Sequence, residues 1–144
     1  MVKNLQISSI DPSINRRATH SLVASLTKQL NFKISSLFIN FVTSNDLLEI
    51  NKKFLKHTYR TDVITFNYST KEKIDGEILI SIEDAFQNAK KFNVSRSEEL
   101  NRLVIHGILH LLGFNDKKPK EKILMSEMEK RLIYKNKFAL LRSR

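Results

Sequence analysis

The sequence predicts an α+β fold in which a small mixed β-sheet packs against about five helices. Several segments repeat apolar residues at helical spacing, and short runs rich in β-branched residues lie between them. No repeat and no linker rich in Gly, Pro or Ser divides the 144 residues, a length typical of one compact domain. We therefore expect a single domain over residues 1–144, with a basic tail from about residue 135.

The first half of the chain predicts two helices on either side of one strand. From Ser13 onward, apolar residues recur every four positions, as in an amphipathic helix: Ile14, Ala18, Leu22, Leu26 and Leu30. Residues 37–42 are mostly β-branched, apolar or aromatic and predict a strand. Thr43 to Asp46 resembles a capping box, so a second helix is expected to begin there and to end near His57. Its inner face is expected to carry Leu47, Ile50 and Phe54.

The second half predicts a hairpin followed by three helices. Residues 62–68 and 76–82 have strand character, and the polar segment 69–75 between them predicts a direct connection. Ser81 and Ser95 are each followed three positions later by an acidic residue, which predicts two helix caps, and the second helix is expected to run to Leu112. Pro119 suits the first turn of a last helix. Its expected inner face consists of Leu124, Met128 and Leu132.

The composition restricts both the chemistry and the partners. The chain has 25 Lys and Arg against 15 Asp and Glu, a net charge of +10 that favours polyanionic partners such as nucleic acid. It has no cysteine, which excludes disulfides, thiol nucleophiles and Cys-ligated metal centres. The first residues lack the apolar core of a secretory signal, and no apolar run is long enough to span a membrane. We expect a cytoplasmic protein without membrane association.

The segment from His106 to Asp116 predicts a metal site at the end of a long helix. His106 and His110 lie four positions apart, so their imidazoles can converge on one cation. Gly113 lets the chain reverse after the helix, which allows Asp116 to supply an oxygen ligand. Two imidazoles and one carboxylate leave the fourth position of a tetrahedral Zn²⁺ open, as in catalytic sites. The alternative is that the two histidines only contact each other without a metal. Gly113 would then be an ordinary helix C-cap, and Asp116 would cap the following turn.

The same spacing is found in the long motif of zinc proteases, in which a Glu follows the first His and acts as general base. Here that position is Gly107. A zinc metallopeptidase that uses the same three ligands is therefore an alternative that lacks its usual base.

Residues 106–116 read His-Gly-Ile-Leu-His-Leu-Leu-Gly-Phe-Asn-Asp. They resemble the signature His-Gly-x-Leu-His-Leu-x-Gly-Tyr-Asp-His of the YbeY-type rRNA maturation factors, which are metal-dependent endoribonucleases. Residues 61–66 and 76–81 resemble two strands of that family, Thr-Asp-Val-Leu-Ser-Phe and Gly-Asp-Ile-x-Ile-Ser. The chain departs from the family at Asp116, where the family has its third His, and at Phe114-Asn115, where it has Tyr-Asp. A carboxylate is still a competent zinc ligand.

The resemblance implies a single-strand-specific, zinc-dependent endoribonuclease that acts in 16S rRNA 3′-end maturation and ribosome quality control. Its partners would be single-stranded RNA, especially rRNA, and the ribosome or its small subunit, and it would hold one Zn²⁺ per chain. A non-catalytic ribosome-binding module with a structural metal is a further alternative, because a basic surface alone can bind rRNA.

Other candidate residues have more than one interpretation. Lys52, Lys53, Lys56 and Arg60 can follow an RNA backbone or form a solvated helix face. The family's Tyr-Arg pair is Phe54-Leu55 here and its later Pro is Arg60, so the role of that family arginine is not transferred. Asp62 is the acidic candidate for general base, with a structural role at the strand start as its alternative. Stacking on bases or packing in the core is expected of Tyr59 and Phe114, and surface or packing roles of His20 and His57.

Overall fold

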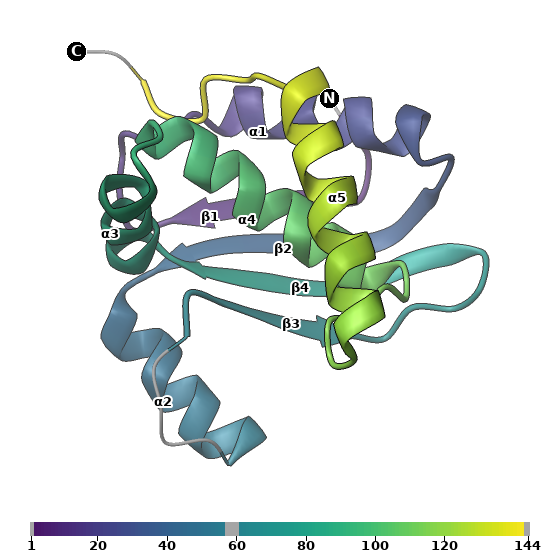
Figure 1. Ribbon diagram of the computed structural model, residues 1–144, viewed down its shortest axis with the longest axis horizontal. Helices are drawn as coiled ribbons and strands as arrows, with labels where there is room; N and C mark the ends of the chain where they lie inside the picture. Colours follow the sequence, from purple (N-terminus) through teal and green to yellow (C-terminus); the bar gives the residue numbers. More distant parts are fainter. Residues whose placement is uncertain (1, 57–60, 143–144) are drawn as a thin grey trace.

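The computed structural model describes residues 2–56 and 61–142. In chain order its elements are β1 (Leu5–Ser9), α1 (Arg16–Gln29), β2 (Lys33–Val42), α2 (Ser44–Leu55), β3 (Val63–Asn67), β4 (Lys73–Ser81), α3 (Ile82–Phe92), α4 (Arg96–Leu111) and α5 (Pro119–Lys135). The predicted α+β class is confirmed, with five helices and one sheet in the described part of the chain (Figure 1).

The sheet has the strand order β1-β2-β4-β3. β1, β2 and β4 run parallel, while β3 pairs antiparallel with β4, so the sheet is mixed as predicted. The predicted hairpin is present, and the Tyr68 N–H donates to the Asp75 carbonyl at 2.7 Å where its strands meet the connection. β4 is a central strand with neighbours on both edges.

The central strand β4 is buried on both faces. Ile78 and Ile80 face the main core, which the sheet shares chiefly with α1 and α4. Leu79 faces a smaller cluster that includes Leu47 of α2 and Ile64 of β3. Figure 1 accordingly shows α4 lying along the sheet and α2 at the lower left, by the start of β3. The long helix α4 is thus held on the main core, and α2 packs separately.

Three of the predicted helix starts are confirmed by their capping bonds, whereas α1 begins at Arg16, after its cap Asn15, and not at Ser13. Thr43 Oγ1 accepts the Asp46 N–H at 3.0 Å, Ser81 Oγ accepts the Asp84 N–H at 3.2 Å, and Ser95 Oγ accepts the Glu98 N–H at 3.0 Å. Pro119 occupies the first turn of α5, as predicted. Each serine or threonine cap supplies an acceptor to an amide that has no partner within its helix.

Strand boundaries differ from the prediction at three places. β1 was not among the predicted strands, because only Leu5 and Ile7 in it are apolar and that is too short an alternation to indicate a strand. It forms an edge strand whose partner is supplied by β2. β2 and β4 begin at Lys33 and Lys73, earlier than predicted, since pairing extends them into polar sequence.

Two residues predicted to face the core are exposed instead. Phe54 is 60% exposed, because it lies near the end of α2 and touches Phe66 only edge-to-face, with ring centroids 6.0 Å apart. Leu124 is 51% exposed, because α5 buries the stripe of Met125, Glu129 and Leu132. α2 ends at Leu55, and His57, near which its end was predicted, lies outside the described residues.

The basic C-terminal segment leaves α5 and packs beside the start of α1. The Asn15 N–H donates to the Leu140 carbonyl at 2.8 Å, and the Arg142 N–H donates to the Ser13 carbonyl at 2.8 Å. Leu140 is fully buried. The segment therefore contributes Leu140 to the main core, and Phe138 and Leu141 pack against that core. No helix in residues 2–56 and 61–142 has both the length and the apolar character needed to cross a membrane.

Candidate metal centre

One stripe of α4 faces outward, and it carries three residues with titratable side chains. Between Glu99 and Leu111 every residue of the helix is buried except Arg102, His106 and His110, which are partly exposed. These three are spaced by four residues and therefore lie one above another on one face. Between residues 99 and 111, these three side chains therefore form the part of α4 that solvent can reach.

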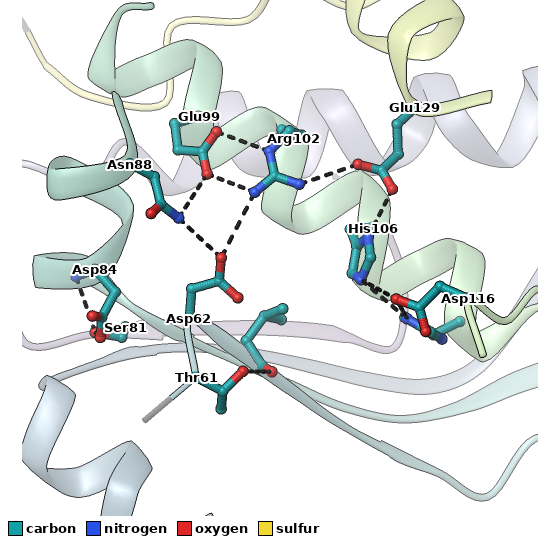
Figure 2. A network of polar contacts seen from close by, with 12 residues as sticks. Thr61, Asp62, Ser81, Asp84, Asn88, Glu99, Arg102, His106, Asp116 and Glu129 are labelled. Carbon is teal, nitrogen blue, oxygen red and sulfur yellow. Dashed lines mark hydrogen bonds and ion pairs between the residues drawn. The ribbon is translucent and has the colours of Figure 1, made fainter. Parts of the chain in front are cut away.

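The structure brings the three predicted metal ligands together. His106 Nε2 and His110 Nε2 are 3.0 Å apart, and Asp116 Oδ2 lies 4.0 Å from the first and 3.9 Å from the second. In the described residues, these are the three side chains whose ligand atoms cluster closely enough to hold a metal ion, within 4.8 Å of one another. Figure 2 shows the carboxylate of Asp116 pointing toward the His106 ring.

Asp116 reaches this position because the chain turns sharply after α4. Gly113 has φ of 101°, a left-handed conformation that glycine adopts without strain. The Gly113 N–H donates to the His110 carbonyl and the Phe114 N–H to the Leu109 carbonyl, both at 3.0 Å. Asn67 Nδ2 on β3 donates to the His110 carbonyl at 3.3 Å. The end of α4 is therefore tied both to its own turn and to the sheet.

The donor set fits a zinc ion. Zinc binds imidazole nitrogen and carboxylate oxygen at about 2.0–2.2 Å, so the ligand atoms around a tetrahedral ion are roughly 3.3–3.6 Å apart. The three separations in this cluster bracket that range, with 3.0 Å between the imidazoles and 3.9–4.0 Å to the carboxylate. Small side-chain movements would seat the ion and leave a fourth position toward solvent.

Burial and the adjacent His106 imidazole lower the pKa of His110, and Asp116 offsets part of this effect. A lowered pKa keeps the imidazole neutral at pH 7, which is the form that binds a metal. The environment of His110 therefore favours the neutral imidazole, which has a free lone pair for a metal ion.

A polar network that sequence reasoning missed extends from His106 along α4 (Figure 2). Glu129 of α5 contacts both His106 Nδ1 at 2.7 Å and Arg102 Nη1 at 3.2 Å. Glu99 binds Arg102 through two hydrogen bonds of 2.9 and 2.7 Å. Two signals in the sequence could have found it: Arg102 precedes His106 by four residues, and Glu129 shares a helical stripe with Met125 and Leu132.

Asp62 belongs to this network and lies outside the histidine cluster. Its Oδ2 accepts from Asn88 Nδ2 at 2.9 Å and is 3.7 Å from Arg102 Nη2. In Figure 2 the guanidinium of Arg102 lies between Asp62 and His106. The Asp62 carboxylate is thus held at the start of β3, which agrees with the structural role given above as the alternative. Its role as general base stays a prediction.

The described lysine candidates lie on α2 or at its end, away from the histidine end of α4 (Figure 1). Lys52, Lys53 and Lys56 are exposed residues of α2 or its C-cap, and Lys52 pairs with Glu49 at 3.9 Å. Phe114 packs against the main core, and His20 is half-buried on α1, where burial lowers its pKa. The candidates His57, Tyr59 and Arg60 lie outside the described residues.

A run of exposed lysines directly follows the third predicted ligand, and sequence reasoning had not singled it out. Lys117, Lys118, Lys120 and Lys122 are all exposed at the start of α5. Their closeness in sequence to Asp116 was the available signal. They place four positive charges within six residues after Asp116.

A cavity of about 320 Å³ lies between α3, α4 and α5. Arg102 and Glu129 are among its lining residues, whereas His106, His110 and Asp116 are not. The clustered side chains lie outside this cavity, where His106 and His110 are partly exposed and Asp116 is exposed.

The chain is similar to known proteins over most of its length. The family model for endoribonuclease YbeY matches residues 2–137. Proteins named endoribonuclease YbeY from Parabacteroides distasonis and Azobacteroides pseudotrichonymphae are 38% and 40% identical, over 85% and 86% of this chain and 86% and 89% of theirs. A solution structure from Thermotoga maritima matches with a TM-score of 0.61 and 30% identity, covering 90% of this chain and 86% of that one. The chain therefore belongs to the endoribonuclease YbeY family.

Proposed function

We propose that this protein is a zinc-dependent, single-strand-specific endoribonuclease of 16S rRNA 3′-end maturation and ribosome quality control, with residues 1–144 as one metallohydrolase domain. Membership of the family supports RNA cleavage. The observation that carries the proposal is the convergence of His106 Nε2, His110 Nε2 and Asp116 Oδ2, and a run of exposed lysines follows Asp116 in the sequence. With an rRNA substrate, the activity would take place in the cytoplasm, on the ribosome or its small subunit.

His106, His110 and Asp116 would hold the zinc ion. A bound zinc ion supplies Lewis acidity, which lowers the pKa of water and offsets charge that develops on a phosphate. The residues of the chain would contribute the remaining functions. The lysines after Asp116 would bind the RNA backbone, while Arg102 is already engaged by Glu99 and Glu129 and positions those carboxylates.

The peptidase alternative loses support from the environment of Gly107. This residue is buried, and a Cβ added to it would lie 2.8 Å from Ile78 Cδ1 and Cγ2. A side chain at this position would therefore point into the sheet and away from the open stripe that carries His106 and His110. A general base therefore cannot occupy the position that it has in zinc proteases.

We expect purified protein to contain about one zinc ion per chain and to cleave a single-stranded rRNA 3′-end fragment. A chelator should abolish cleavage, and added zinc should restore it. His110→Ala should lose both the metal and cleavage. Metal content by mass spectrometry and cleavage on a denaturing gel, with the same fragment annealed to its complement as control, measure these outcomes.

Two results would contradict the proposal. Metal bound without cleavage would favour the ribosome-binding module with a structural metal. A protein that neither contains metal nor binds added zinc would overturn the site itself.

The lysines after Asp116 predict a salt-sensitive contribution to RNA binding. Lys117→Gln with Lys118→Gln should weaken binding and flatten its salt dependence, by about 0.7 in the slope of log K against log salt for each lysine that contacts a phosphate. Neither change removes a helix cap, because Lys118 makes no side-chain capping bond. Titration of single-stranded RNA at several salt concentrations measures the slope.

The matched control is Lys90→Gln with Lys91→Gln on α3, which removes the same charge. Lys90 and Lys91 lie in the last turn of α3, near the beginning of α4 and away from its histidine end (Figure 1). If the control pair lowers affinity as much as the test pair, the effect comes from net charge and the local assignment is wrong.

A further inference from the structure

Glu129 is a carboxylate in a buried position. It is 8% exposed and shares the inner stripe of α5 with Met125 and Leu132. A carboxylate in such a position is costly unless hydrogen bonds and opposite charge compensate it. Its two oxygens are compensated by different partners: Oε2 lies 2.7 Å from His106 Nδ1, and Oε1 lies 3.2 Å from Arg102 Nη1.

The contact with Glu129 selects one form of the His106 ring. A carboxylate only accepts hydrogen bonds, so the nitrogen that contacts it, Nδ1, must carry the proton. A neutral imidazole with its proton on Nδ1 has its lone pair on Nε2. Nε2 is the atom that lies 3.0 Å from His110 Nε2 and 4.0 Å from Asp116 Oδ2. Glu129 therefore directs the lone pair of His106 into the cluster.

Arg102 holds Glu129 in place and leaves the region negatively charged. Its guanidinium contacts Glu99 at 2.7 Å, Glu129 at 3.2 Å and Asp62 at 3.7 Å. One positive charge thus faces three carboxylates, and Glu99 and Glu129 are both buried. The excess negative charge beside His106 favours the approach of a cation, because charges interact more strongly where water is excluded.

We propose that Glu129 is a positioning residue for the metal centre: it fixes His106 with the proton on Nδ1 and strengthens the hold of Nε2 on a divalent cation, while Arg102 fixes Glu129. The inference rests on the metal site of the proposed function and adds a residue from a different helix to it. Hydrogen bonds from a ligating imidazole to a carboxylate fix ring orientation and raise the basicity of the ligand.

The first test is the affinity for zinc without RNA, measured by competition with a chromophoric chelator. Glu129→Gln keeps the shape of the side chain and removes its charge, and we expect affinity about 10- to 100-fold weaker than in the wild type. Glu127→Gln is the matched control, because Glu127 is an exposed residue of the same helix. Circular dichroism compares the folding of both variants with that of the wild type.

The second test needs no metal, and its main result comes from the wild type alone. In metal-free wild-type protein, the ¹⁵N chemical shifts of His106 should show Nδ1 protonated and Nε2 unprotonated at a pH where the ring is neutral. In folded Glu129→Leu, the two tautomers should become mixed. A structural role of Glu129 alone would move the stability but not this signature.

The outcomes separate this inference from the proposed function. If the wild type binds zinc and Glu129→Gln binds it equally tightly, the positioning role is wrong and the proposed function stands. If the wild type binds no zinc, the proposed function fails. His106 with its proton on Nε2 in the wild type would overturn the inference whether or not zinc binds.

Discussion

His106→Ala is expected to abolish cleavage of single-stranded RNA while leaving most RNA binding intact. Its Nε2 is the atom nearest to both other members of the cluster, 3.0 Å from His110 Nε2 and 4.0 Å from Asp116 Oδ2. Because loss of an indirect partner of a metal ligand already costs about 10- to 100-fold, removal of a ligand should lower cleavage by more than about 100-fold. The phosphate contacts are proposed to come from the lysines after Asp116 and not from His106, so affinity should change by no more than about threefold.

The measurement pairs cleavage under single-turnover conditions with binding by fluorescence anisotropy, using one labelled fragment. His20→Ala is the control, since His20 is a half-buried histidine of α1 outside the cluster. The substitution at His106 leaves the contact of Glu129 with Arg102 in place, and circular dichroism checks that the fold survives. Equal loss of binding and cleavage would contradict the division of roles between the cluster and the lysines.

The features predicted correctly from the sequence are those fixed by neighbouring residues. Thr43, Ser81 and Ser95 cap their helices because each finds its partner amide three residues later. The hairpin between β3 and β4 follows from two strand-forming runs with a short polar connection. In the same way, His106 and His110 meet because four residues make one helical turn, and Gly113 permits the reversal that brings Asp116 near them.

The features that were missed depend on contacts between distant segments. β1 has too little apolar sequence to be recognised and becomes a strand by pairing with β2. Which stripe of α5 is buried depends on how the helix packs against the rest of the protein. The apolar character of Leu124 alone could not indicate this, and Leu124 is exposed. The pairing of Glu129 with His106 and Arg102 follows from that packing, over 23 and 27 residues of sequence. The interactions that complete the candidate site are therefore tertiary, although its ligands could be predicted locally.

Gly107→Glu tests whether this site could work as a peptidase, because it restores the residue type that zinc proteases have after their first histidine. We expect it to produce no peptidase activity and to unfold most of the protein. The added Cβ would lie 2.8 Å from Ile78 Cδ1 and Cγ2, and Ile78 is fully buried in the main core. The variant would thus overpack the contact between α4 and β4 and bury a carboxylate, at a combined cost of more than about 4 kcal/mol.

A loss of that size is a large share of the stability of a small domain, about 5–15 kcal/mol. Gly107→Ala separates the cost of overpacking from the cost of the buried carboxylate. Overpacking costs about 1–3 kcal/mol, and the better helix propensity of alanine returns about 1 kcal/mol, so this variant should stay folded with a lower melting temperature. Urea unfolding followed by circular dichroism measures both variants. If Gly107→Glu folded as stably as the wild type and cleaved peptides, the side chain at position 107 would have to reach the open stripe of α4. The packing of α4 on β4, on which the choice of nuclease over peptidase depends, would then be wrong.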